Sequence, residues 1–174
     1  IADPGAGNDD GEVLIVTSHR LSSLQFNAEI DGGTGGSADI TIEGAPGSGE
    51  RFGYALAAGE VDGDTQGDLV ICAPMGGPPG DPTLGLPGAG VARLYLGNSL
   101  QSHTLRQPDH ADAVFRGEVA DQSGYVGDRF CSSVNMSVDA DNNGLPELIV
   151  GAPGWQASSG GGETGKAYVF INPY

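Results

Sequence analysis

Two short segments carry oxygen-bearing side chains at alternate positions. These side chains are Glu60, Asp62, Asp64 and Asp68 in segment 60–68, and Asp139, Asp141, Asn143 and Glu147 in segment 139–147. A calcium ion takes about six to eight oxygen ligands, and a tight loop that turns every second side chain inward supplies them. The spacing therefore predicts one calcium ion (Ca2+) in each segment.

The backbone of each segment is expected to complete the set of ligands. Gly144 allows a sharp turn in the second segment, where the carbonyl of Leu145 is the expected backbone ligand. The carbonyl of Gln66 takes this place in the first segment, which begins with Glu60 and has Thr65 where the second has Gly144. These two differences affect the geometry of the first loop more than its charge.

The alternative interpretation is that both segments are ordinary polar turns, which are commonly rich in Asp, Asn and Gly. Their common register, and the mutual repulsion of several carboxylates within one short loop, favour a bound cation. Two other acidic segments, 8–10 and 109–112, lack the alternation. We expect these to be solvated loops.

The charge balance excludes several partners. The chain has 23 Asp and Glu residues against 7 Lys and Arg, a net charge of −16. Phosphate backbones and anionic lipid surfaces repel such a polyanion, so we expect no nucleic-acid partner. The sequence also has no apolar run of about 18 residues, which predicts no membrane insertion.

Motifs of common enzymes do not appear. His19, His103 and His110 lack the spacing of a zinc site, and the sequence contains neither a G-x-S-x-G elbow nor a phosphate loop. We therefore expect no catalytic residues and no enzyme activity. Asn135-Met136-Ser137 matches the N-glycosylation pattern, but it falls in an expected inner strand, where we interpret it as a chance match.

The elements that position the acidic segments are repeated along the chain. Three blocks recur in the same order: 38–44 with 111–117, 49–53 with 127–131, and 68–74 with 147–153. Apolar runs at 54–60, 68–72, 91–96 and 111–116 read as four short strands between glycine-rich turns. Four antiparallel strands per repeat predict an all-β fold of propeller-type blades, in preference to a β-sandwich.

Weaker matches at both ends extend the repeat. On this register, residues 1–44 supply strands three and four of one blade, residues 45–117 a complete blade, and residues 118–174 strands one to three of another. The prediction is thus a partial propeller of about two and a quarter blades. Incomplete blades leave unpaired strand edges, and we expect neighbouring chains to pair these edges head to tail in a filament or other homopolymer.

Three of these features together resemble an FG-GAP repeat: Arg51-Phe52-Gly53, the acidic segment 60–68, and Cys72-Ala73-Pro74. The second copy retains Gly151-Ala152-Pro153 but departs at Phe130-Cys131. FG-GAP repeats form the seven-bladed propeller of integrin α chains and occur in secreted bacterial proteins. The resemblance implies an extracellular or cell-surface location, while such propellers bind many unrelated partners.

The two cysteines stand where this family has glycine. Cys72 replaces the Gly of one GAP, and Cys131 replaces the Gly of the next FG. Two interpretations are open, a pair of buried thiols or a disulfide, because neighbouring blades bring the two positions to one side of the sheet stack. An extracellular location favours the disulfide.

Two classes of function fit these observations. The first is an extracellular calcium-binding module for protein–protein assembly or adhesion. The alternative is a fragment of a secreted propeller enzyme of the calcium-dependent phosphoesterase type. The seven Lys and Arg residues are scattered along the chain, which weighs against recognition of phosphate and favours the module.

Overall fold

The computed structural model describes residues 10–18, 38–77, 88–101, 105–106, 110–118, 127–157 and 162–171. These residues form ten β-strands and one short 3-10 helix. The elements are β1 (Glu12–Ile15), β2 (Ile40–Glu43), β3 (Leu56–Gly59), β4 (Asp68–Ala73), β5 (Val91–Tyr95), η1 (Ser99–Gln101), β6 (Leu105–Arg106), β7 (Ala113–Arg116), β8 (Ser133–Val138), β9 (Glu147–Ala152) and β10 (Lys166–Phe170).

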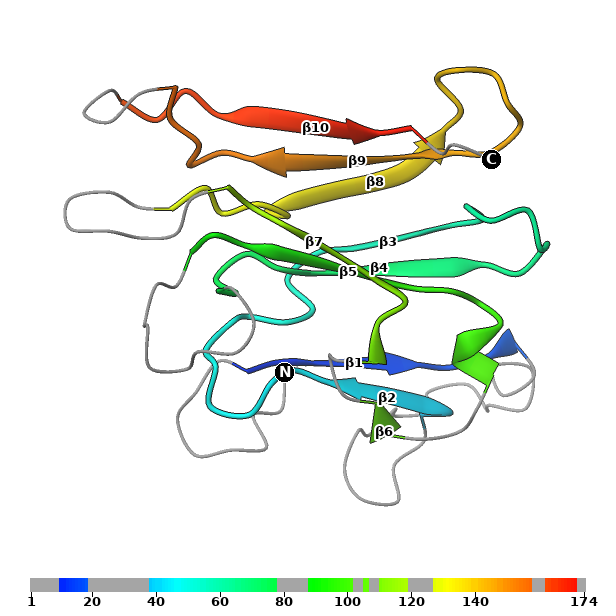
Figure 1. Cartoon of the computed structure of the whole chain (residues 1–174). Helices are drawn as coiled ribbons and strands as arrows, with labels where there is room; N and C mark the ends of the chain where they lie inside the picture. Colours follow the sequence, from blue (N-terminus) through cyan, green and yellow to red (C-terminus); the bar gives the residue numbers. More distant parts are fainter. Residues whose placement is uncertain are drawn as a thin grey trace, which may run out of the picture.

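The strands form three sheets that stack as layers (Figure 1). The first sheet has the order β1-β2-β6, the second β3-β4-β5-β7 and the third β10-β9-β8. In the second sheet all neighbours are antiparallel, and its four strands coincide with the four predicted apolar runs, except that β4 extends one residue beyond its run. The prediction of an all-β fold with antiparallel, propeller-type sheets is confirmed.

One strand pair departs from this pattern. Strand β6 lies between β5 and β7 in the sequence, yet it pairs with β2 of the first sheet, and the pair is parallel. The connection from β5 to β7 thus reaches across to the neighbouring sheet and covers the outer edge of β2, whose main-chain groups would otherwise lack partners. Sequence periodicity contains no signal for so short a strand.

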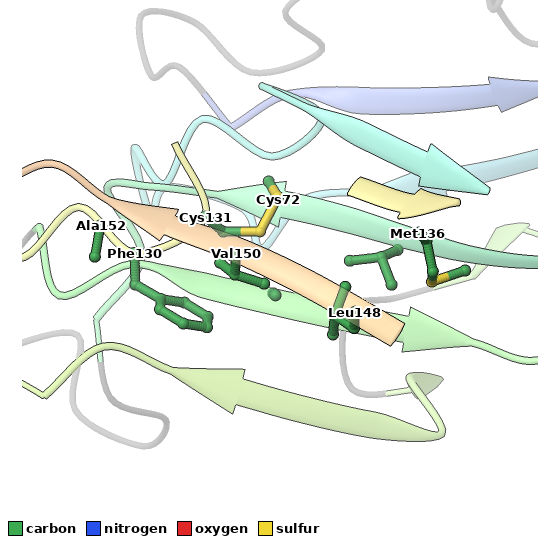
Figure 2. Close-up of a cluster of buried hydrophobic side chains, with 9 residues drawn as sticks. Cys72, Phe130, Cys131, Met136, Leu148, Val150 and Ala152 are labelled. Carbon is green, nitrogen blue, oxygen red and sulfur yellow. A yellow bond between two sulfur atoms is a disulfide. The ribbon is translucent and has the colours of Figure 1, made fainter. Parts of the chain in front are cut away.

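The second sheet is buried on both faces because its side chains alternate between two cores. On β4, Val70 and Cys72 point toward the third sheet, whereas Ile71 and Ala73 point toward the first. Figure 2 shows the core between the second and third sheets, built around Phe130. Burial on both faces explains why β4 is a continuous apolar run in the sequence rather than an alternating one.

A buried phenylalanine fixes each junction between sheets. The backbone N–H of Phe52 donates to the carbonyl of Asp10 at 3.1 Å, and that of Phe130 donates to the carbonyl of Ala89 at 3.0 Å. At Gly90 an added Cβ would lie 2.1 Å from the carbonyl oxygen of Phe130, so only glycine permits this approach. The repeated phenylalanine therefore sets the spacing of the stacked sheets.

No described helix is long and apolar enough to cross a bilayer.

Candidate metal centres and the disulfide

The first acidic segment connects β3 to β4. Its Glu60, Asp62 and Asp68 each place a carboxylate oxygen within 4.8 Å of the others. Asp68 is the first residue of β4 and is buried, whereas the other two are partly exposed. The hairpin therefore gathers three carboxylates around one point at the end of the second sheet.

The second acidic segment makes the same connection between β8 and β9. Here Asp139, Asp141 and Glu147 gather their carboxylate oxygens within 4.8 Å. Glu147 is the first residue of β9 and is fully buried, like Asp68 in β4, while the two aspartates are exposed. The equivalent positions of both repeats thus form equivalent clusters.

The two loops also share one backbone conformation. The fourth position has positive φ in both, at Gly63 (79°) and Asn142 (63°). The sixth position has positive φ as well, at Thr65 (69°) and Gly144 (92°). The left-handed turns at these two places bring the alternate side chains to one side of each loop.

A backbone amide holds the buried carboxylate of each cluster in the same way. The N–H of Val61 donates to Oδ2 of Asp68 at 2.7 Å, and the N–H of Ala140 donates to Oε2 of Glu147. Asp68 also accepts from the N–H of Gly97 through Oδ1, at 2.8 Å. In Glu147, by contrast, Oε1 is buried and has no hydrogen-bond partner among the described residues.

These environments fit a hard cation with oxygen ligands. A buried carboxylate oxygen without a partner is costly, and a bound cation would satisfy Oε1 of Glu147. In the first loop, desolvation and the neighbouring carboxylates of Asp64, Asp68 and Glu60 raise the pKa of Asp62, against a lowering by the N–H of Asp64. A cation would relieve this repulsion too.

One predicted ligand side chain, that of Asp64, lies outside the carboxylate cluster of its loop. The carboxylate of Asp64 accepts from the N–H of Gln66 at 2.7 Å, and Oδ1 of Asn143 accepts from the N–H of Leu145 at 2.8 Å. Each of these hydrogen bonds closes a short turn, in which a side-chain oxygen accepts from the backbone N–H two residues later. Metal ligation by these side chains, and by the carbonyls of Gln66 and Leu145, stays a prediction.

Comparison with known proteins identifies the unit that carries the loops. The FG-GAP repeat family matches residues 52–95 and 133–170, and each match contains one acidic loop. The chain carries two FG-GAP repeats.

Part of the chain is also similar to an integrin alpha chain. Human integrin alpha-IIb is 37% identical over 105 residues, which make up 60% of this chain and 8% of the integrin. Mouse integrin alpha-IIb is 35% identical over 105 residues, with the same shares of the two chains. The chain thus spans about 8% of the length of these relatives.

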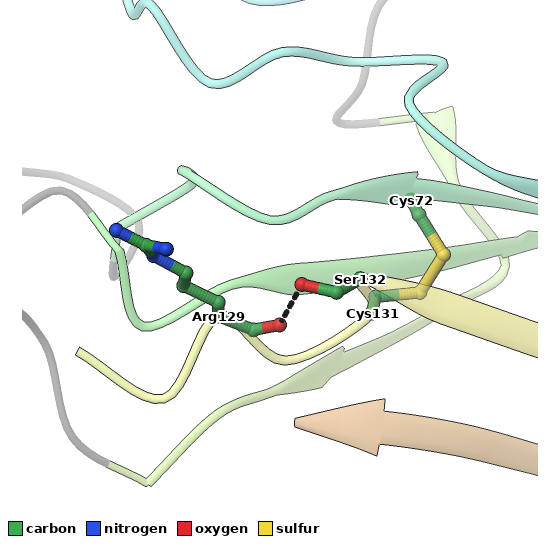
Figure 3. Close-up of a disulfide and its surroundings, with 4 residues drawn as sticks. All are labelled: Cys72, Arg129, Cys131 and Ser132. Carbon is green, nitrogen blue, oxygen red and sulfur yellow. Dashed lines mark hydrogen bonds between the residues drawn. A yellow bond between two sulfur atoms is a disulfide. The ribbon is translucent and has the colours of Figure 1, made fainter. Parts of the chain in front are cut away.

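A disulfide links the first FG-GAP repeat to the residues that lead into the second. Cys72 on β4 is bonded to Cys131, which precedes β8, across a sequence separation of 59 residues (Figure 3). Cys131 has φ of 67°, and Gly53 at the equivalent place in the first repeat has φ of 83°. Both cysteines are fully buried in the core between the second and third sheets, so the bond lies inside the stack.

Buried acids at the sheet junctions are a feature that the sequence analysis missed. Asp10, expected in a solvated loop, is 6% exposed, and its carboxylate accepts from the N–H groups of Gly47 and Gly49. That expectation was wrong because backbone N–H groups of a distant loop need an acceptor, and the carboxylate of Asp10 is buried where it accepts from them. Glu50 and Asp128, also buried, occupy one repeat position, and this shared position was an available signal.

A polar cluster joins the second repeat to the chain that precedes it. Glu118 accepts from Lys166, from Nε1 of Trp155 at 3.0 Å and from the hydroxyl of Tyr168 at 2.9 Å. These bonds, the one from Lys166 first, lower the pKa of Glu118 to about 2. Nζ of Lys166 lies 4.8 Å and 4.7 Å from the ring centroids of Trp155 and Tyr168.

Replacement of Thr65 by glycine is expected to stabilise the protein by about 1 kcal/mol, because a β-branched residue is strained at its positive φ. Thr65 is exposed, so the change removes no packing. Urea denaturation measures the effect. The reverse change Gly144→Thr should destabilise the second loop by a similar amount, since space around Gly144 is open. Equal stability of Thr65→Gly and wild type would contradict this account.

Proposed function

We propose that this chain is an extracellular calcium-binding module that serves protein–protein adhesion or assembly. The observation that carries the proposal is the pair of equivalent acidic clusters, one in each FG-GAP repeat. Two loops with one backbone conformation and one arrangement of carboxylates are expected to bind the same ion. The similarity to integrin alpha-IIb supports a role in protein interaction at the cell surface.

The chemistry of the ligands supports calcium. Each cluster consists of carboxylate oxygens, without histidine or cysteine, and oxygen ligands suit hard cations such as calcium. The loops are partly open on their outer side, where Asp139 and Asp141 are exposed. Three gathered carboxylates suit calcium better than magnesium, which usually binds through one or two carboxylates and keeps several waters.

The disulfide supports the proposed location. Disulfides persist in oxidising compartments and are rare in the cytosol. The Cys72–Cys131 bond is fully buried between two sheets and is part of the core. In an oxidising compartment this bond would hold the second and third sheets together from within the core between them.

A free strand edge supports assembly by strand addition. Among the described residues β10 pairs with β9 alone, whereas the equivalent β5 pairs with β4 and β7. Val169 and Ile171 are 53% and 60% exposed beside this edge. We propose that a second copy of the chain pairs with β10, head to tail, and that repeated contacts build a filament or other homopolymer.

The proposed contact between β10 and a second copy of the chain lies next to the two acidic loops. An open apolar groove of about 570 Å³ runs between the second and third sheets. Phe115 and Phe170 line it from the two sheets, and Asp62 and Pro146 of the two acidic loops border it. Calcium binding would therefore also order the rim of the surface on which a neighbouring chain lies.

Calcium titration of the purified chain tests the proposal. Calorimetry should show two binding events for the wild type and for the control Glu163→Ala, which removes an exposed charge outside both loops. Asp141→Ala should retain one binding event, because it removes a carboxylate from the second cluster and leaves the first intact. Light scattering on the same samples should show association in calcium and its loss in chelator.

Three results would each contradict a separate part of the proposal. Absence of binding heat, together with a melting temperature that chelator does not change, would exclude the calcium sites. Binding without any change in mass would show that calcium does not promote self-association. Calcium-dependent hydrolysis of a phosphate ester would favour the phosphoesterase alternative over a binding module.

A further inference from the structure

The sequence contains one Asn-Gly pair, Asn143-Gly144, and this pair lies in the second acidic loop. An asparagine followed by glycine is chemically labile, because glycine has no side chain to hinder attack of its backbone nitrogen on the asparagine amide. Both residues are exposed, and a Cβ added at Gly144 would meet nothing within 4 Å. The pair therefore has the composition and the space that this reaction needs.

The open position of Gly144 is a property of the loop itself. Thr65 holds the same place in the first loop and is also exposed, although the third sheet stacks on the sheet to which that loop belongs. Thr65 and Gly144 share a positive φ, 69° and 92°. A further sheet stacked on the third would therefore leave Gly144 as open as Thr65 is.

Hydrogen bonds within the closed loop hold the pair in an unreactive conformation. The N–H of Gly144 donates to Oδ2 of Asp139 at 2.9 Å, and the N–H of Leu145 donates to Oδ1 of Asn143 at 2.8 Å. The N–H of Asn143 donates to Oδ1 of Asp139 at 3.1 Å. When Asn143 cyclises, its Cγ takes the place of the hydrogen on the nitrogen of Gly144, so the bond from Gly144 to Asp139 must break first.

The residue that holds Gly144 is also a member of the second carboxylate cluster. Asp139, Asp141 and Glu147 gather their oxygens within 4.8 Å, and Oε1 of Glu147 is buried without a hydrogen-bond partner among the described residues. Without a cation these carboxylates repel one another, and the repulsion favours loop conformations in which Asp139 moves away. Departure of Asp139 releases the N–H of Gly144. The protection of Asn143 thus depends on a cation in the cluster.

We propose that Asn143 is a deamidation site that bound calcium protects, an inference that rests on the proposed calcium sites. In the calcium-free loop the nitrogen of Gly144 gives its proton to solvent and forms a bond to Cγ of Asn143. The bond from Cγ to Nδ2 breaks, and Nδ2 takes up one proton and leaves as ammonia. Water from the solvent then opens the cyclic imide at either carbonyl, which gives aspartate or isoaspartate.

The two products differ in their effect on the loop. Asp64 holds the place of Asn143 in the first loop, so the repeat accommodates an aspartate there. Isoaspartate instead routes the main chain through Cγ and lengthens it by one carbon, which displaces the following residues, Glu147 included, from their places in the cluster. A period without calcium would therefore leave part of the protein permanently unable to close its second loop.

Peptide mass spectrometry of the whole chain, incubated at neutral pH in calcium or in chelator, tests the proposal. A reaction confined to the calcium-free loop slows by the factor 1 + [L]/Kd, about a hundredfold when free calcium is a hundredfold above Kd. We expect deamidation of Asn143 in chelator, with isoaspartate detected by an isoaspartate-specific methyltransferase, and slowing by this factor in calcium.

Three variants separate the parts of the mechanism. Glu147→Gln keeps an acceptor for the N–H of Ala140 but removes a carboxylate from the cluster, so it should deamidate at one rate in calcium and in chelator. Gly144→Asn should slow the reaction in chelator, because asparagine tolerates positive φ while its Cβ hinders cyclisation. The control Glu163→Ala, outside both loops, should behave as the wild type.

Calorimetry on the same samples separates this inference from the proposed calcium sites. If calcium binds the second loop and Asn143 deamidates equally fast in calcium and in chelator, the protection is disproved and the calcium sites stand. Calcium binding with no deamidation in chelator would likewise overturn the inference alone. If calcium neither binds nor changes the melting temperature, both proposals fail.

Discussion

Removal of calcium with a chelator is expected to lower the free energy of unfolding by about 5 kcal/mol when free calcium is a hundredfold above Kd at both sites. Each site that binds the folded state alone contributes about 2.7 kcal/mol under this condition. The physical reason is the repulsion among Glu60, Asp62 and Asp68, and among the equivalent acids of the second loop. Thermal melts in calcium and in chelator measure the loss.

Variants assign this response to the two loops. Asp141→Ala should remove about half of the calcium-dependent stabilisation, because the clusters lie in separate hairpins and bind independently. Glu163→Ala removes an equal charge from an exposed position outside the loops and should retain the full response. Identical melting curves of the wild type in calcium and chelator would refute calcium-linked stability.

Loss of the Cys72–Cys131 bond is expected to destabilise the protein by about 4 kcal/mol. The bond closes a loop of 59 residues, and the chain-entropy model gives this magnitude for the freedom that the unfolded chain regains. Urea denaturation of the wild type with and without reductant measures the loss. Peptide mapping of the unreduced protein should find one peptide pair joined through the two cysteines.

A matched pair of double variants separates the bond from the backbone strain at Cys131. Cys72→Ala combined with Cys131→Ala removes the bond and keeps a side chain at positive φ. Cys72→Ala combined with Cys131→Gly should be more stable than the first by about 1 kcal/mol, since glycine adopts this conformation without strain. Two free thiols in the native protein, or no effect of reductant, would disprove the role of the bond.

Local spacing was sufficient to predict several parts of this protein. The alternation of carboxylates in 60–68 and 139–147 predicted that acids gather within each hairpin, because a short hairpin loop has few ways to arrange its alternate side chains. Asp64 was expected among these acids and lies outside the first cluster. The apolar run 68–72 predicted β4 for a similar reason, since burial on both faces requires an unbroken apolar strand. The division of the chain at residues 44 and 117 stays a prediction.

Other features depend on which distant segments meet. Asp10 is buried because it binds amides about 40 residues away, and β6 exists because the edge of β2 is within its reach. The partners of Glu118 lie 37 to 50 residues along the chain.

The sequence by itself determined the repeat, the strands of the second sheet and the acidic loops, because each depends on residues that are near one another in the chain. Only the tertiary structure decided the burial of Asp10, which sheet covers which face, and the lack of a partner for Oε1 of Glu147 among the described residues. A side chain's burial is set by the sheet stacked upon it, and that sheet comes from another part of the chain.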